Sequence, residues 1–128
     1  MANRLLLVSI GGALGSVLRY LMSGAVQRLL RDATFPYGTL CVNVLGCLVV
    51  GMLSQLAESR GAFTGDARLF LVVGLLGGFT TFSAFGNETM NLLREAEFDL
   101  ALANALGSVV LGLGAVWLGR AVAFWVWR

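Results

Sequence analysis

The segment from Gly77 to Glu88, GGFTTFSAFGNE, places residues that could bind ions inside an apolar stretch of chain. Its glycine pair favours a kink or unwinding of a helix, because glycine tolerates non-helical backbone angles. A break leaves the last carbonyls of the first half-helix unpaired, and their partial negative charge suits a small hard cation. Beyond the break, Phe82, Phe85 and Ser83 offer an anion two positive ring edges and a hydroxyl donor. The segment therefore predicts an ion site, although phenylalanines at helical spacing usually pack in a core.

Two other apolar segments carry polar residues on a single helical face. These faces consist of Thr39, Asn43 and Gly46 in one segment and of Asn104, Ser108 and Gly112 in the other. An amide inside a lipid-crossing helix must face protein or water, so Asn43 either bonds another helix or donates to an anion. Two polar faces beside the glycine-rich segment favour a shared, lined path for an ion.

Two charged residues close to these faces admit more than one role. Arg19 is the only basic residue well inside an apolar segment, where a charge costs at least ~2.5 kcal/mol unless it is paired or reaches the interface. We expect Arg19 to anchor its helix or to charge a vestibule rather than to trap an anion. Glu88 lies one turn beyond Phe85, where it would line a vestibule or cap the membrane edge.

These residues need a membrane-spanning frame, and the composition supplies one. The chain has 128 residues, of which 58% are hydrophobic and 12% charged, too few polar groups for the surface of a soluble domain. A bilayer core takes about 20 helical residues to cross, and apolar segments of that order lie at about 4–29, 37–57, 68–93 and 100–127. The predicted fold is all-α and integral to the membrane. It has four transmembrane helices, the third broken near its middle, in one channel domain over residues 1–128.

The connections and small residues constrain how these helices pack. Pro36 should lie just before or at the first turn of the second helix, where its missing N–H costs nothing. The link 94–99 is short, so the third and fourth helices must be antiparallel neighbours. Small residues at one-turn spacing let backbones approach closely, either as ordinary packing or in a dimer interface. They are Gly11 with Gly15, Gly12 with Ser16, Gly74 with Gly78, and Ser108 with Gly112.

The distribution of arginine says little about orientation. One end gathers Arg4, Arg60, Arg68, Arg120 and Arg128, and the other gathers Arg19, Arg28, Arg31 and Arg94. The positive-inside rule compares such counts, and the two ends hardly differ. Either orientation is set weakly, or the chain inserts both ways and pairs antiparallel with itself.

Several classes of activity are excluded. The chain has no histidine or lysine, which removes common proton relays, and it contains no Gly-rich phosphate loop. The spans use the whole length, so no soluble catalytic domain fits, and no nucleophile–base pair is present. We expect neither an enzyme nor an ATP-driven pump, and no nucleic-acid partner.

Several pieces of the chain together resemble the Fluc (CrcB-type) family of bacterial fluoride channels. The matching pieces are GGALGSVLRY (11–20), PYGTLCVN (36–43), GLLGGFTTFSAF (74–85) and Glu88. The resemblance implies a passive, fluoride-selective channel that exports cytoplasmic fluoride across the bacterial inner membrane. It also implies a dual-topology antiparallel homodimer with two fluoride pores at the subunit interface. A central structural Na⁺ would be held by the backbone carbonyls of Gly77 and Thr80.

The resemblance also assigns roles to side chains. Phe82 and Phe85 match the ring-edge phenylalanines, and Asn43 matches the pore amide. Ser108 matches a pore-side hydroxyl, and Ser83 matches one member of a polar track. The full set of expected pore residues is Asn43, Phe82, Phe85, Ser83, Ser108, Thr39, Asn104 and Glu88.

This chain departs from the family pattern at several positions of the track. Ala84 and Gly86 replace hydroxyl residues, Asn104 stands where relatives carry an aromatic hydroxyl, and Gly112 where some carry serine. We therefore expect the track either to run through Asn104, Ser83 and Asn87 or to be filled by water.

Two other functions fit the sequence less well than a channel does. A small dual-topology multidrug or cation antiporter needs an acidic residue in its first span, where this chain has Arg19 instead. A purely structural membrane subunit would leave the grouping of Asn43, Thr80, Thr81 and Ser83 without a reason.

Overall fold

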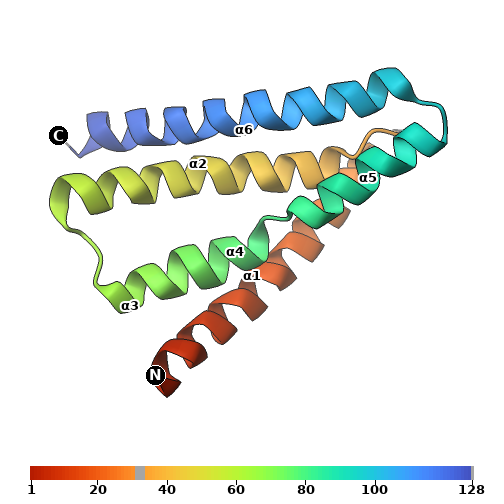
Figure 1. Cartoon of the computed structure of the whole chain (residues 1–128). Coiled ribbons are helices and arrows are strands. Elements are labelled where there is room, and N and C mark those ends of the chain that lie inside the picture. Colours follow the sequence, from red (N-terminus) through yellow and green to blue (C-terminus); the bar gives the residue numbers. More distant parts are fainter. Residues whose placement is uncertain (31–33, 128) are drawn as a thin grey trace.

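The computed structural model describes residues 1–30 and 34–127, which form four long helical spans (Figure 1). The first, second and fourth are α1 (Ala2–Leu29), α2 (Tyr37–Arg60) and α6 (Phe98–Val126). The third is composite, with α3 (Gly65–Arg68), the π-helix η1 (Leu69–Leu76), α4 (Gly77–Phe79) and α5 (Phe82–Arg94). All four spans are long and apolar enough to cross a membrane. The prediction of an all-α, multi-pass membrane protein with a broken third span is confirmed.

Local sequence signals explain where these helices begin and end. Pro36 immediately precedes the first residue of α2, as predicted. The same helix ends at Gly61, whose left-handed backbone (φ 58°) lets its N–H bond the Ala57 carbonyl at 3.1 Å. Thr64 caps α3 by accepting a hydrogen bond from the Ala67 amide. Residues 31–33, between α1 and α2, lie outside the described residues.

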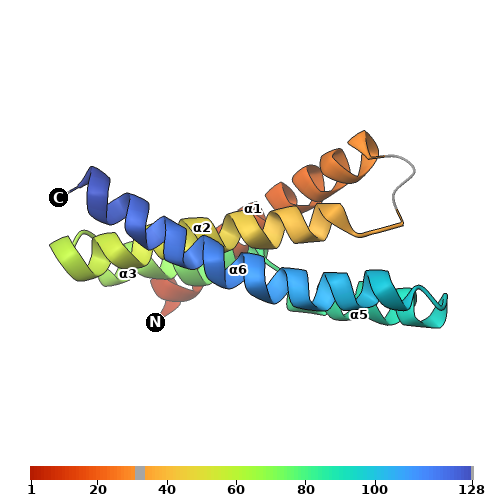
Figure 2. The same ribbon diagram turned by 90° about the horizontal axis from the view of Figure 1, so that it is seen from above.

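The helices run back and forth between two ends of the bundle (Figure 1). Both termini and the α2–α3 link lie at one end, which we call the terminal end. The α5–α6 turn lies at the opposite end, which we call the turn end. Helices α2 and α6 lie side by side along their length, and α5 returns beside α6 (Figures 1 and 2). The predicted antiparallel contact between the third and fourth spans is confirmed.

Small residues set the close approaches within the subunit. A Cβ atom placed on Gly15 would lie 2.0 Å from the Leu75 carbonyl oxygen, and one on Gly78 would lie 2.4 Å from that of Gly12. Neither contact leaves room for a side chain, so α1 crosses the third span backbone to backbone. Gly11 and Gly15 thus serve packing within the chain, which was one of the two roles expected for the small residues.

The α2–α6 contact uses glycines that the sequence analysis did not single out. A Cβ atom on Gly51 would lie 2.3 Å from the Val116 carbonyl oxygen, and one on Gly119 would lie 2.1 Å from that of Leu48. These two helices therefore also approach each other closely, and they hold the second and fourth spans in a fixed register beside the broken span.

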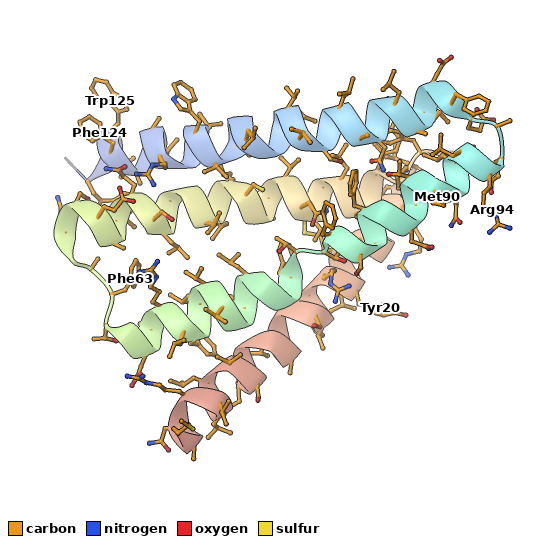
Figure 3. All side chains as sticks on the ribbon, in the orientation of Figure 1. Tyr20, Phe63, Met90, Arg94, Phe124 and Trp125 are labelled. Carbon is orange, nitrogen blue, oxygen red and sulfur yellow. The ribbon has the colours of Figure 1, made fainter. Side chains whose placement is uncertain are left out.

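Charged and aromatic side chains mark the two ends of the bundle. At the terminal end Arg120 pairs with both carboxylate oxygens of Glu58, and Arg60 donates to the Trp127 carbonyl. Phe124 and Trp125 project there from α6, while Arg94 projects at the turn end (Figure 3). Such residues are typical of the two membrane–water interfaces. Arg31 and Arg128, which entered the comparison of the two ends, lie outside the described residues.

Candidate ion site at the broken helix

The break in the third span lies at Thr80 and Thr81, whose backbones are extended (φ −82°, ψ 157° and φ −151°, ψ 120°). Gly77 and Gly78 belong to α4 and remain helical. The prediction that the glycine pair itself unwinds is therefore wrong in position. The reason is that Gly78 packs against the backbone of Gly12 in α1, so this glycine is needed for close approach and not for unusual backbone angles.

The break frees the carbonyls of Gly77 and Thr80 from their helical partners. In a continuous helix these carbonyls would accept from the amides of Thr81 and Ala84, four residues on. Here the Thr81 amide donates to Asn43 Oδ1 at 2.8 Å, and the Ala84 amide donates to Thr81 Oγ1 at 3.1 Å. Both backbone amides thus donate to side chains and not to the helical carbonyls. The carbonyl oxygens of Gly77 and Thr80 therefore have no helical donor and could bind a cation.

Asn43, on α2, hydrogen-bonds the backbone at the break. Its Oδ1 accepts from the Thr81 amide, and its Nδ2 donates to the Thr81 carbonyl at 2.9 Å. The interhelical role considered for Asn43 is therefore observed. One N–H of its amide group is not used in this pairing, and Asn43 also lines the adjacent cavity. The same side chain can thus hold the break and offer a donor.

Arg19, on α1, hydrogen-bonds the backbone just before the break. Its Nε donates to the Gly78 carbonyl at 3.0 Å, and the Ser16 hydroxyl lies 3.5 Å from the same oxygen. The sequence did not predict this bond from the guanidinium to the backbone, and the anchor and vestibule roles expected for Arg19 stay predictions. A cation at the carboxyl end of a helix is favourable, since the unpaired carbonyls carry partial negative charge.

A cavity of about 400 Å³ lies beside the break. It brings together six of the expected site residues: Asn43, Gly77, Thr80, Phe82, Phe85 and Ser108. The remaining lining residues are mostly apolar, and no charged side chain of the described part of the chain is among them. A small ion in this cavity would meet a few polar groups in otherwise apolar walls.

The two phenylalanines stand together at the cavity with ring centroids 5.4 Å apart and planes inclined by 44°. Phe82 is 83% exposed in the structure, so it does not pack in the core of this chain, which was the ordinary alternative for such residues.

The other expected residues lie outside that cavity. Thr39 donates to Glu88 Oε1 at 2.6 Å, and Glu88 Oε2 is buried with no hydrogen-bond partner among the described residues. Asn104 is 2% exposed and donates to Thr89 Oγ1 at 2.9 Å, which ties α6 to α5. Ser83 is exposed on α5, with its hydroxyl 3.3 Å from that of Thr81.

The family called CrcB-like protein, Camphor Resistance (CrcB), matches residues 6–120 of the chain. The chain belongs to this family. A protein of Methylobacillus flagellatus is 50% identical over 116 residues, and one of Thermus thermophilus is 52% identical over 117. A third, from Opitutus terrae, is 47% identical over 120. The matches cover 91–92% of this chain and 90–92% of each relative, and all three relatives are named fluoride-specific ion channel FluC.

In this CrcB-like chain, sequence reasoning missed the contribution of Thr81 and Thr89. Thr81 is the N-cap of α5, and a threonine directly before a helical run is a recognised capping signal. That signal could have placed the break one turn later. The partnership of Thr89 with Asn104 has no sequence signal, because it depends on how α5 and α6 face each other.

Proposed function

We propose that this chain is the subunit of a fluoride-selective channel that carries fluoride passively out of the cytoplasm. The observation that carries the proposal is the cavity at the broken helix, which is lined by an amide, a hydroxyl and two phenylalanine rings and by no charged side chain of the described residues. The names of the relatives from Methylobacillus and Thermus agree with this function.

The chemistry of the lining suits fluoride. Fluoride is small and strongly hydrated, so a pore must replace its water with hydrogen-bond donors. The unused N–H of Asn43 and the hydroxyl of Ser108 are such donors, and the positive edges of Phe82 and Phe85 add weak contacts. Conduction requires an ion to bind well enough to enter but weakly enough to leave. A lining without lysine or arginine meets the second requirement.

A path for the ion beyond the cavity is also proposed. Thr39, Ser83, Glu88 and Asn104 lie on the elements that continue from the cavity to the turn end. Thr39 and Glu88 are paired there by a hydrogen bond between α2 and α5. We assign Thr39, Ser83 and Glu88 to the polar side of this path, and Asn104 to the contact that keeps α5 and α6 together beside it.

The working unit proposed is an antiparallel homodimer of dual topology. Lipid cannot hydrogen-bond the exposed backbone at a break in mid-membrane, so protein must cover it. Gly77, Phe82 and Ser83 are exposed on the single subunit at this place. A second, inverted copy would cover one break with the other and complete a pore on each side. The nearly even division of arginine between the two ends permits both orientations.

The same dimer would hold a structural Na⁺ between the two breaks. The donor set fits a hard cation, because the Gly77 and Thr80 carbonyls have lost their helical donors to Asn43 and Thr81. Two subunits would supply four such oxygens. The ion, when bound, would supply a fixed positive charge that joins the two broken helices. No cluster of His, Cys, Asp or Glu in the described residues offers an alternative metal site.

Fluoride efflux from liposomes tests the proposed function. Purified protein is reconstituted, the vesicles are loaded with fluoride or with chloride, and release is followed with ion-selective electrodes under the same gradient. We expect rapid release of fluoride and retention of chloride. Equal release of both ions, or release of neither, would rule the proposal out.

A further inference from the structure

The four backbone carbonyls of residues 77–80, at the end of α4 and the start of the break, differ in their hydrogen-bond partners. The donors expected for Gly77 and Thr80 bond side chains instead. The Gly78 carbonyl, by contrast, is occupied by Arg19 Nε at 3.0 Å, with Ser16 Oγ at 3.5 Å. One oxygen of the break is therefore already bound to a cation that belongs to the chain.

The position of Arg19 is fixed by how α1 crosses the third span. Gly78 lies against the backbone of Gly12, and Gly15 lies against that of Leu75, and neither Gly78 nor Gly15 has space for a side chain. This contact leaves little freedom for α1 to shift, so the Arg19 side chain, further along α1, is held near the end of α4. Asn43 of α2 also hydrogen-bonds the Thr81 backbone. Two helices therefore bond the backbone around the break, α1 at the Gly78 carbonyl and α2 at the Thr81 carbonyl.

We propose that Arg19 is a positioning residue, a tethered cation that fixes the Gly78 carbonyl and thereby the direction of the neighbouring Gly77 carbonyl. The Thr80 carbonyl shares its peptide plane with the Thr81 amide, which Asn43 holds from α2. A peptide plane that is held at Gly78 limits rotation of the planes on either side of it. The guanidinium of Arg19 bonds the Gly78 carbonyl, whereas the carbonyls of Gly77 and Thr80, which are proposed to bind Na⁺, are not bonded by Arg19. This inference rests on the proposed channel function only through its flux readout.

Arg19 does not line the proposed pore. Arg19 lines a separate cavity of about 470 Å³ with Ser16, Tyr20, Ser23 and Gly24, and none of these residues lines the cavity at Asn43. Tyr20, its neighbour, projects outward from α1 (Figure 3). Arg19 therefore acts on the pore through the backbone of α4 and not by contact with an ion in the cavity of Asn43.

The first test compares Arg19→Met and Arg19→Lys with Arg28→Met, a change at an exposed arginine at the end of the same helix. Both arginines are replaced by methionine and not by glutamine, because the amide nitrogen of a glutamine would lie at the position of Nε and could donate to the same carbonyl. Hydrogen–deuterium exchange of the segment 77–85 reports the order of the break without reference to flux. We expect Arg19→Met to speed exchange there and to lower fluoride efflux about tenfold. Arg19→Lys should recover most of both, since an ammonium can donate to the same carbonyl. Arg28→Met should change neither.

A backbone ester at Phe79 provides a test that keeps the Arg19 side chain and so does not depend on the folding of Arg19→Met. The ester makes the Gly78 carbonyl a weaker acceptor, and we expect faster exchange at the break and slower efflux. In the Arg19→Met background the ester should add little, because the bond is already absent. Wild-type exchange in Arg19→Met, or fully additive effects of the two changes, would overturn the inference. Absence of efflux from the unmodified protein would instead refute the channel and leave the exchange test intact.

Discussion

Replacing Asn43 with alanine removes both hydrogen bonds that hold the Thr81 peptide groups, the 2.8 Å bond from its amide and the 2.9 Å bond to its carbonyl. A buried polar group left without a partner costs about 1–3 kcal/mol. Thr81 is half-buried, so the lower figure applies to each group, which gives about 2 kcal/mol in total. At about 1.4 kcal/mol for each factor of ten, the ordered break becomes roughly 30-fold less populated relative to disordered forms.

We expect this change to appear as a fall in fluoride efflux of about the same factor, with the subunit still folded. Efflux from liposomes gives the rate, and the thermal unfolding midpoint in detergent gives the fold. Asn91→Ala is the matched control, because Asn91 is an exposed asparagine on α5 away from the break. Asn43→Asp keeps the acceptor for the Thr81 amide but loses the donor and adds a negative charge at the cavity, so it should abolish efflux. Efflux from Asn43→Ala at the level of Asn91→Ala would refute the reasoning.

Three further predictions concern packing, the α5–α6 contact and the metal. Gly78→Ala places a Cβ atom 2.4 Å from the Gly12 carbonyl oxygen and should destabilise the subunit by about 1–3 kcal/mol. Gly24→Ala, with nothing within 4 Å, should not lower the unfolding midpoint, and equal midpoints for both variants would contradict this. Asn104→Leu should cost about 1 kcal/mol through the lost bond to Thr89, measured as a lower unfolding midpoint, and an unchanged midpoint would count against that contact. Exchange of Na⁺ for a large organic cation should lower both the dimer fraction, measured by light scattering, and the efflux rate; identical values in both media would argue against the metal site.

The spans could be predicted from the sequence because hydropathy and local signals determine them. The expected ranges end within a few residues of the observed helices, and Pro36 marks the start of α2 as predicted. Their packing was predicted less completely. The roles of Gly51 and Gly119 depend on which carbonyl of the facing helix each one meets, and that is a property of the assembled bundle.

The break illustrates the limit of local reasoning. Glycine flexibility pointed to residues 77–78, but the break lies three residues later, at Thr80 and Thr81, where the Thr81 amide donates to Asn43 of α2. The acceptor lies 38 residues away along the chain, so no local pattern contains it. The Thr81 cap was readable in the sequence, whereas the partner of Arg19 was not, because a backbone carbonyl carries no residue-type signal.

The candidate site was predicted in part. Six expected residues line one cavity because their helical faces converge, as the spacing on each span indicated. Asn104 shares a helical face with Ser108 but is buried against α5 outside that cavity. One turn along α6 separates a residue at the cavity from one in a helix contact, and spacing alone does not resolve that difference.

The central claim is that the cavity at the broken third span conducts fluoride and rejects chloride. The most direct measurement is the reversal potential of the reconstituted protein in a planar bilayer, with fluoride on one side and an equal concentration of chloride on the other. The account predicts a large potential that approaches the equilibrium value for fluoride as residual chloride permeability vanishes. A reversal potential near zero, which means equal permeability to the two ions, would contradict it.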